Sequence, residues 1–448
     1  MKKIVLLVLT VLMLSIPMGI ISAEEIFEAE GPGINYIPHS LYNPDKESGI
    51  ELYSVNGWNI SEQSKRELYN LIVSNLNKKT KSFSVSSYRI PVVKDAEGRV
   101  TGTVDEFADL YYSAVYNNPQ SGYLMTGYSF SYNTSGLVTS IIPYYMPDSE
   151  YDEDRYRFMA DYALSMCISP DMTEVEKLLS IHDYLTDNIK YNTTNGMWCY
   201  TPYGALVDGV AVCQGYSLAY KLLCDRAGLN VSYVVDSPHN HIWNVAEIDG
   251  KYYHIDVTWD DPNYPGDTDQ SVNQTRHSYF LLSDDTNYEI REFTERTWVN
   301  YFGDCTDASF ENSVYSKLNL PLVWKDGAFW GRGLKYVSDA YGDRLEYSGR
   351  LYKVYNGVYS EVKASDFAPF DELEYRFGYI HDDVLAVCGT PKTVRTLFSA
   401  SYSGDGDFEG VRLAKMQFDS EGRGVIKGVV GDKQLLWGDN MKPAAYPR

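Results

Sequence analysis

Two strand patterns joined at 249–250 constrain the fold of this 448-residue chain more than any other feature. The turn residues are Asp-Gly, a strong signal for a two-residue β-hairpin between strands 241–248 and 251–259. Pairing residue 248 with 251 sets the register. Because side chains alternate along strands, His241 and Asp256 then lie on one face as diagonal neighbours, roughly 7–8 Å apart at the backbone. A slip of one residue would put them on opposite faces.

A cysteine precedes this hairpin at the predicted start of a helix. A loop rich in Gly and Pro (195–209) leads to Cys213, and the pattern 213–223 is helical with Leu218 and Leu222 on its inner stripe. Gly228 ends the helix, and a strand is predicted over 230–235. Unsatisfied N–H groups and the positive dipole end at a helix start favour a thiolate. The same N–H groups can face an oxyanion that develops beside the sulfur.

Cys213, His241 and Asp256 together have the residue types of a thiol catalytic triad. A carboxylate hydrogen-bonded to the imidazole would fix the ring tautomer. It would also stabilise the imidazolium that forms when the thiol loses its proton. A lone cysteine is more often an ordinary buried residue, so the hypothesis depends on all three.

Other residues of the segment compete for these roles. His239 precedes His241 on a loop and would replace it if the strand began late. His254 shares the sheet face, and we interpret it as a packed strand residue. We interpret Asp260 and Asp261 as residues that cap a turn, and Cys224 as a core residue.

The order of these motifs resembles the transglutaminase-like superfamily, a branch of the papain-like cysteine enzymes. The resemblance runs from the helix 173–189 through 212–216, 228–229 and 241–245 to 255–260, about a third of the chain. It implies Cys213 as nucleophile, His241 as general base and then acid, and Asp256 as the residue that orients the imidazole. It also implies an oxyanion-hole side chain upstream of the cysteine. The candidates, which stay open, are Tyr191, Trp198 and Tyr203.

Residues next to the triad are candidates for the substrate cleft, namely Gln214, Gly215 and Trp243; Gly215 would leave room beside the first helical turn. We expect no metal and no cofactor. A zinc site from Cys213, His241 and His254 lacks four-ligand spacing. The acidic run 260–269 offers the clustered oxygens that calcium prefers, but it lacks EF-hand spacing, so calcium is kept only as an alternative.

The fold class is predicted to be α+β, with three domains. A small N-terminal α+β domain (24–150) contains helices at 61–76 and from an N-cap at Asp105, and strands within 82–93 and 123–145. The transglutaminase-like domain spans 151–308 and opens with a helix from Thr173, which has capping-box spacing to Glu176. A β-rich, sandwich-like accessory domain spans 309–448, with turn signals that include 348–349. The 40 tyrosines favour β-structure.

The N-terminus is typical of an export signal. Lys2 and Lys3 precede an apolar run, and the stretch 21–23 ends in small residues, which suggests cleavage before Glu24. We therefore expect a secreted, extracellular protein at the cell surface or cell wall, with no membrane span after signal removal. The net charge of −22 argues against nucleic acid as a partner. Oligomeric state and disulfide pairing of the six cysteines cannot be deduced from the sequence.

The expected function is acyl transfer from peptide or glutamine carbonyls through a thioester. Attack by water would make the protein a peptidase or amidase, and attack by a lysine amine would make it a transglutaminase. Peptide hydrolysis is slightly favoured. The alternative is a catalytically idle module that serves as a cell-surface or cell-wall adhesion protein.

Overall fold

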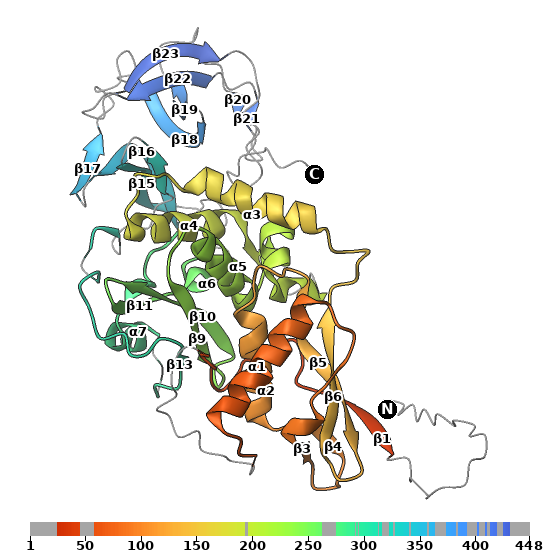
Figure 1. The fold of residues 1–448 in the computed structure, drawn as a ribbon. Coiled ribbons are helices and arrows are strands. Elements are labelled where there is room, and N and C mark those ends of the chain that lie inside the picture. The colour runs from red at the N-terminus through yellow and green to blue at the C-terminus, as the bar shows by residue number, and fades with distance from the viewer. Residues whose placement is uncertain are drawn as a thin grey trace, which may run out of the picture.

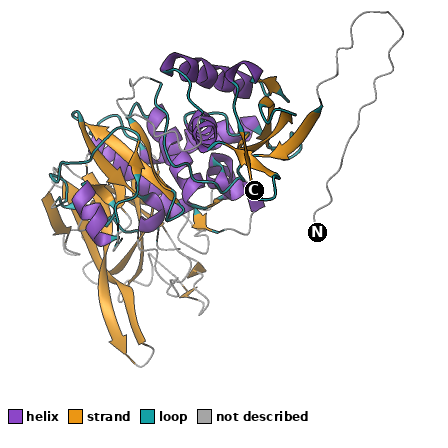
Figure 2. Cartoon of the chain, turned by 90° about the horizontal axis from the view of Figure 1, so that it is seen from below, coloured by secondary structure: helices purple, strands orange, loops and turns teal. Residues whose placement is uncertain are grey.

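The computed structural model describes residues 25–44, 58–192, 196–261, 275–291, 293, 295–311 and 313–315, and beyond these the strands β14–β23 bounded below. The predicted signal peptide (1–23) and residues 262–269 of the acidic run lie outside the described residues. The structure confirms the predicted α+β fold class (Figure 1). In Figure 2 the helices lie between two groups of strands.

The N-terminal part is a four-stranded sheet with two helices. The sheet has the order β1-β5-β6-β2. Its elements are β1 (Ile26–Glu30), α1 (Glu62–Asn77), β2 (Phe83–Ser84), β3 (Val92–Lys94), β4 (Val100–Thr103), α2 (Asp105–Tyr116), β5 (Leu124–Asn133) and β6 (Val138–Tyr145). Helix α1 starts at its predicted cap, because Ser61 accepts a hydrogen bond from the Ser64 amide. Asp105 is the first residue of α2 and not its N-cap, which is Val104.

The strand predicted over 82–93 is divided. Only its ends pair with other strands, as β2 and β3, because a 3₁₀ turn (Ser86–Tyr88) interrupts the segment. Strand β1 lies in the segment before α1, where the sequence shows no clear periodicity. It is nevertheless paired with β5 along its length. Helix α2 is buried on nearly all sides.

The middle part packs helices against a five-stranded antiparallel sheet of order β12-β11-β10-β9-β13. Its helices are α3 (Glu153–Cys167), α4 (Glu174–Asn188), α5 (Cys213–Arg226), α6 (Val257–Asp260) and α7 (Asp284–Ile290). Its strands are β7 (Lys190–Tyr191), β8 (Val210–Ala211), β9 (Val231–Asp236), β10 (His241–Ile248), β11 (Lys251–Ile255), β12 (Phe280–Leu282) and β13 (Val299–Asn300). Two short helical turns, Gly196–Tyr200 and Gly204–Asp208, precede β8.

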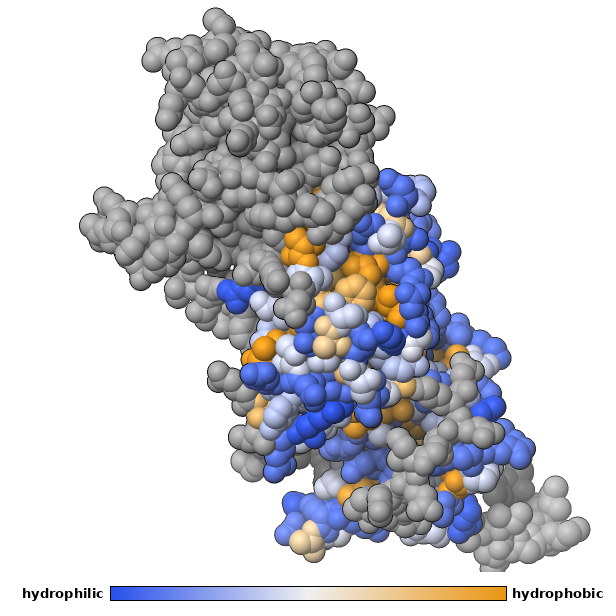
Figure 3. Space-filling model, turned by 90° about the vertical axis from the view of Figure 1, so that its left-hand side faces the viewer, coloured by the Kyte–Doolittle hydropathy of each residue, from blue (hydrophilic) through white to orange (hydrophobic). Residues whose placement is uncertain are grey.

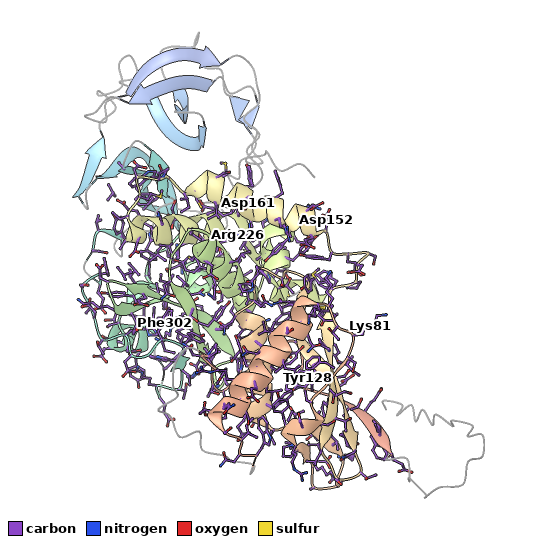
Figure 4. The ribbon with its side chains drawn as sticks, viewed as in Figure 1. Lys81, Tyr128, Asp152, Asp161, Arg226 and Phe302 are labelled. Atoms are coloured by element: carbon purple, nitrogen blue, oxygen red, sulfur yellow. The ribbon has the colours of Figure 1, made fainter. Side chains whose placement is uncertain are left out.

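Helix α5 lies at the centre of this layer. It packs on β10, with α3 and α4 on its other side (Figure 1). Arg226, in its last turn, donates a hydrogen bond to Asp161 of α3 at 2.6 Å; both are labelled in Figure 4. The capping box at Thr173 and Glu176 is present at the start of α4. Gly228 has φ +76°, a conformation that favours glycine, just beyond the end of α5.

The hairpin has the predicted turn and register. Asp249 and Gly250 both have positive φ, as a type I′ turn requires, and Ile248 pairs with Lys251. The second strand, however, ends at Ile255, earlier than predicted. The chain leaves the sheet there because the Asp256 carboxylate caps the short helix α6. The prediction that Asp256 is a strand residue diagonal to His241 is therefore wrong: Asp256 is the N-cap of α6, and His241 pairs with Asp236 of β9.

The C-terminal part consists of antiparallel strands. One sheet contains β14 (Leu322–Lys325), β15 (Ala328–Asp339), β16 (Gly342–Tyr355) and β17 (Val358–Val362); a second contains β18 (Leu373–His381), β19 (Val384–Pro391), β22 (Leu413–Phe418) and β23 (Gly424–Val430), and β20 (Ser401–Tyr402) pairs with β21 (Phe408–Glu409). The turn predicted at 348–349 is wrong, since both residues lie within β16. The domain boundaries themselves stay predictions.

No helix among the described residues is long and apolar enough to cross a membrane. On the face shown in Figure 3, hydrophilic residues cover most of the described surface, and hydrophobic residues form small groups between them. The cysteines whose side chains are described, Cys167, Cys199, Cys213, Cys224 and Cys305, are all buried and unbridged.

Candidate active site

Cys213 is the first residue of helix α5, as the sequence predicts. Its N-cap is Val212, whose amide donates a hydrogen bond to the Cys199 carbonyl at 2.9 Å and so holds the preceding turn beside the cysteine. The residue is only 8% exposed. The N–H groups of a first helical turn have no intrahelical acceptor, so the sulfur lies at the positive end of the helix.

The His241 ring bridges Cys213 and Asp256. Its Nε2 lies 2.7 Å from Asp256 Oδ2, within a buried pair. The His241 side chain also interacts with that of Cys213, and this interaction contributes to the raised pKa of the imidazole. Because Nε2 faces the carboxylate, Nδ1 is the nitrogen left for the thiol. The three side chains therefore form one chain of contacts from sulfur to carboxylate.

Hydrogen bonds between α5 and the sheet fix the spacing of cysteine and histidine. The Ser217 hydroxyl donates to the Ile242 carbonyl at 3.1 Å. The Asn244 amide donates to the carbonyls of Ser217 and Ser232, both at 3.1 Å. One turn after Cys213, the helix is thus bonded to the strand that carries His241. A shift of Cys213 relative to His241 would therefore break buried hydrogen bonds.

The Asp256 carboxylate uses both oxygens. Oδ1 accepts the amides of Thr258 and Trp259 at 3.1 Å each, and so caps α6. Oδ2 accepts from His241 Nε2 and, at 2.6 Å, from Arg291 Nη2. With four donors around it, the carboxylate has one fixed orientation toward the imidazole.

These contacts determine the charge states of the pair. Burial lowers the pKa of His241, but the charge and hydrogen bond of Asp256, together with contacts to Cys213, outweigh it and raise the pKa from 6.5 to about 9. Burial raises the pKa of Asp256, but His241 and Arg291 outweigh it and hold that pKa far below its ordinary value. At neutral pH the pair is therefore an imidazolium and a carboxylate.

Arg291 is the site residue that the sequence analysis missed. It follows helix α7, and its Nε donates to Asn287 Oδ1 at 2.8 Å while Nη2 reaches Asp256. The guanidinium carbon lies 4.3 Å from the ring centroids of both Trp243 and Trp259. No local sequence pattern predicts this role, because Arg291 lies 35 residues beyond Asp256 and contacts it only through the tertiary fold.

Two residues predicted to line the cleft are buried instead. The Gln214 amide accepts from the Tyr116 hydroxyl at 3.2 Å and donates to Thr126 Oγ1 at 3.0 Å, so it links α5 to the N-terminal part. Trp243 is 1% exposed and donates from its indole to His254 Nδ1 at 3.0 Å. Both side chains support the triad from the protein interior.

Gly215 has a packing role. A Cβ at this position would lie 2.5 Å from the carbonyl oxygen of Cys199 and 2.9 Å from the Ala211 side chain. The expectation that Gly215 leaves room for a substrate is therefore wrong, since neighbouring backbone fills that space. The glycine instead allows the turn 196–200 to approach the first turn of α5.

The three oxyanion-hole candidates lie in different surroundings. Tyr191 is half-buried in β7, with its ring 6.5 Å from that of Tyr216. Trp198 is half-buried in the turn whose Cys199 carbonyl accepts the Val212 amide. Tyr203 is buried. Its ring packs 5.9 Å from that of Tyr156, on α3.

The rival histidines have other partners. His239 Nδ1 lies 2.9 Å from Asp236 Oδ2, and its ring stacks on Phe293 with 3.9 Å between centroids. His254 lies in β11 with its Nε2 2.9 Å from Asp284 Oδ1, and burial lowers its pKa. His254 is thus a packed strand residue, as interpreted from the sequence.

A second buried group of histidines and carboxylates lies behind α6. His182 Nε2 is 3.2 Å from Asp260 Oδ2, and Asp183 Oδ1 is 2.9 Å from His182 Nδ1 and 2.8 Å from His277 Nε2. Donor atoms around a tetrahedral zinc would lie about 3.4 Å apart. The shorter separations are those of hydrogen bonds. Asp260 therefore joins α6 to this buried group, which we call the His182–Asp260 relay, and is more than a turn cap.

A comparison with family models finds a match for the part of the chain that contains Cys213, His241 and Asp256. Residues 162–257, which include all three triad positions, match the transglutaminase-like superfamily. This match places that part of the chain in the superfamily. A search of curated proteins found no match.

Two solved structures match part of this chain at low similarity. One, described as a TGase, is 14% identical with a TM-score of 0.21, and the match covers 33% of this chain and 47% of that chain. The other, described as "a Putative Cysteine Protease from Cytophaga hutchinsonii", is 18% identical with a TM-score of 0.20, and covers 30% and 54%. The chain thus spans about half the length of each. The assignment depends on the family match and not on these structures.

Proposed function

We propose that Cys213, His241 and Asp256 are the catalytic triad of a thiol enzyme that transfers acyl groups from peptide or glutamine carbonyls. The observation that carries the proposal is the His241 ring, which contacts both the thiol and a fixed carboxylate. The superfamily includes cysteine proteases and transglutaminases, which supports an enzyme of this general kind.

The reaction follows from the order of the contacts. Cys213 Sγ attacks the carbonyl carbon, the C–S bond forms and the carbonyl electrons move to oxygen. N–H groups at the start of α5 stabilise this oxyanion. His241 then donates its Nδ1 proton to the leaving amine as the C–N bond breaks, which gives a thioester. An acceptor attacks the thioester, His241 takes the acceptor's proton, and the Cys213 thiolate leaves.

We propose water as the main acceptor, which makes the reaction a hydrolysis. Cys213 and His241 are 8% and 7% exposed, so little of the reacting centre is open to solvent. A water molecule reaches such a thioester more easily than the long side chain of a protein lysine. Attack by a lysine amine would instead give an isopeptide cross-link from the same intermediate.

Acyl transfer to a generic ester tests the chemistry before any natural substrate is known. The protein is mixed with p-nitrophenyl acetate and followed by intact mass and peptide mapping. We expect one acetyl group on Cys213 that is lost in water, and none in Cys213→Ala. Cys224→Ala is the matched control, because Cys224 lies buried on the same helix. Acetylation that is unchanged by His241→Ala would overturn the proposal.

The acceptor is tested with casein and monodansylcadaverine. New peptide N-termini without dansyl incorporation support hydrolysis, whereas dansylated glutamine supports transamidation. Both readouts depend on the same thioester, so Cys213→Ala must abolish whichever is seen.

We further propose that the enzyme is exported and acts on protein or peptide substrates at the cell surface. The supporting observation is the sequence of residues 1–23, with its basic start, apolar run and small residues before Glu24. N-terminal sequencing of protein from medium and cells of a bacterial host tests this. We expect a mature chain that begins at Glu24, and an uncleaved cytosolic protein would contradict the proposal.

A further inference from the structure

Arg291 carries a charge in a position where water cannot solvate it. Its side chain is fully buried, and Asp256 Oδ2, at 2.6 Å, is its ion-pair partner among the described residues. Nη1 is also buried and has no hydrogen-bond partner there. Burying a guanidinium without full hydrogen bonding is costly. A buried guanidinium therefore requires favourable interactions with its surroundings that offset this cost.

Aromatic rings provide that support. The guanidinium lies 4.3 Å from the centroids of Trp243 and Trp259 and 5.0 Å from that of Tyr279, within cation–π range. The two tryptophans also flank His241, with ring centroids 5.5 Å away in each case. The same pair of indoles thus contacts both cations that share Asp256.

The shared oxygen makes the two cations interdependent. Asp256 Oδ2 accepts from His241 Nε2 and from Arg291 Nη2, so the carboxylate cannot rotate toward one without losing the other. The groups that face His241 are Cys213 from α5, Asp256 before α6 and, across that carboxylate, Arg291 after α7. Arg291 is the permanent positive charge of this set.

We infer that Arg291 is a positioning residue for the triad, which fixes the Asp256 carboxylate against His241 and tunes how strongly the imidazole holds its proton. The inference rests on the proposed function. Because the guanidinium keeps Asp256 ionised and oriented, the imidazole keeps one tautomer. Its positive charge also opposes the imidazolium, so it limits the proton affinity that the carboxylate gives to His241.

The test is a titration of histidines labelled at ring Cε1, followed by NMR in the full-length protein. Loss of the His241 signal in His241→Ala assigns it. Arg291→Met keeps the hydrophobic stem between the tryptophans but removes the charge. We expect the His241 midpoint to rise by about one pH unit or more, because a nearby positive charge is lost. Cys213 alkylation at pH 7 is expected to slow several-fold as the carboxylate loses its orientation.

Arg291→Lys is the conservative variant and should return the midpoint toward wild type. Arg296→Met is the matched control. Arg296 also lies over a tryptophan, Trp298, and pairs with a carboxylate, Asp284, but away from the triad. An unchanged His241 midpoint in Arg291→Met would overturn the inference, even if stability fell. If Arg291→Met does not fold, Arg291→Gln and Arg291→Lys provide the same comparison.

Failure of the proposed function is a separate result. It would appear as ordinary reactivity of Cys213 in the wild-type protein, whatever Arg291 does to the histidine titration.

Discussion

Replacement of Asp256 by asparagine tests the electrostatics of the site most severely. The carboxylate accepts four hydrogen bonds, two from backbone amides of α6 and two from the side chains of His241 and Arg291. An asparagine has one oxygen and one NH₂ group. If its oxygen keeps the cap of α6, its NH₂ group faces two donors, so His241 and Arg291 lose their common acceptor.

The size of the effect follows from the surroundings of His241. The pKa of His241 is about 9, against an ordinary 6.5, although burial by itself lowers it. Without the carboxylate, burial dominates and the pKa falls below 6.5. A fall from about 9 to the ordinary 6.5 corresponds to about 3 kcal/mol, at ~1.36 kcal/mol per pH unit. This agrees with the cost of about 3–5 kcal/mol for breaking a buried ion pair.

The assay combines histidine NMR with urea unfolding at pH 7. We expect Asp256→Asn to move the His241 midpoint below 6.5 and to lower the free energy of unfolding by about 3 kcal/mol. Asp284→Asn is the control, since Asp284 pairs with His254 in an equally buried setting. It should destabilise the protein but leave the His241 midpoint unchanged. A His241 that still titrates near 9 in Asp256→Asn would refute the reasoning.

Three further predictions concern the framework of the site. Gly215→Ala places a methyl group 2.5 Å from the Cys199 carbonyl; we expect a loss of about 1–3 kcal/mol in urea unfolding together with slower alkylation of Cys213, and unchanged values would contradict the packing role. Asn244→Ala removes the two hydrogen bonds by which β10 is tied to α5 and to β9; we expect about 1–3 kcal/mol of destabilisation and slower alkylation, and a loss of stability alone would show that these bonds do not set the thiol geometry. His182 and His241 both have a pKa of about 9 in the folded protein against an ordinary 6.5. Their contribution to stability is therefore complete below about pH 6.5 and is lost as the pH rises through about 9; the free energy of unfolding, measured from pH 6 to 10, should fall, and a rise would contradict these protonation states.

Features set by neighbouring residues could be predicted from the sequence. The Asp249-Gly250 turn fixes the hairpin register, and Thr173 and Glu176 fix the start of α4. A glycine-rich loop followed by a helical pattern predicts the helix start at Cys213. Each of these signals lies within a few residues of the element that it defines.

The remaining features depend on contacts between distant residues. Val257 and Thr258 are β-branched and continue the strand pattern, so the sequence predicts a longer strand where the Asp256 carboxylate in fact caps α6. Arg291 and the His182–Asp260 relay join residues 35 and 78 positions apart. No periodicity records such contacts, because packing and not local propensity creates them.

The most direct test of the central claim is the rate of Cys213 alkylation by iodoacetamide as a function of pH. Wild type, His241→Ala and Asp256→Asn are compared, with the modified cysteine identified by peptide mapping. We predict that wild-type Cys213 reacts well below the usual thiol pKa of about 8.5, and that both substitutions suppress this reactivity. If Cys213 reacts as an ordinary thiol, or not at all, in all three proteins, the triad is not assembled, and a binding role for an idle transglutaminase-like module becomes the better account.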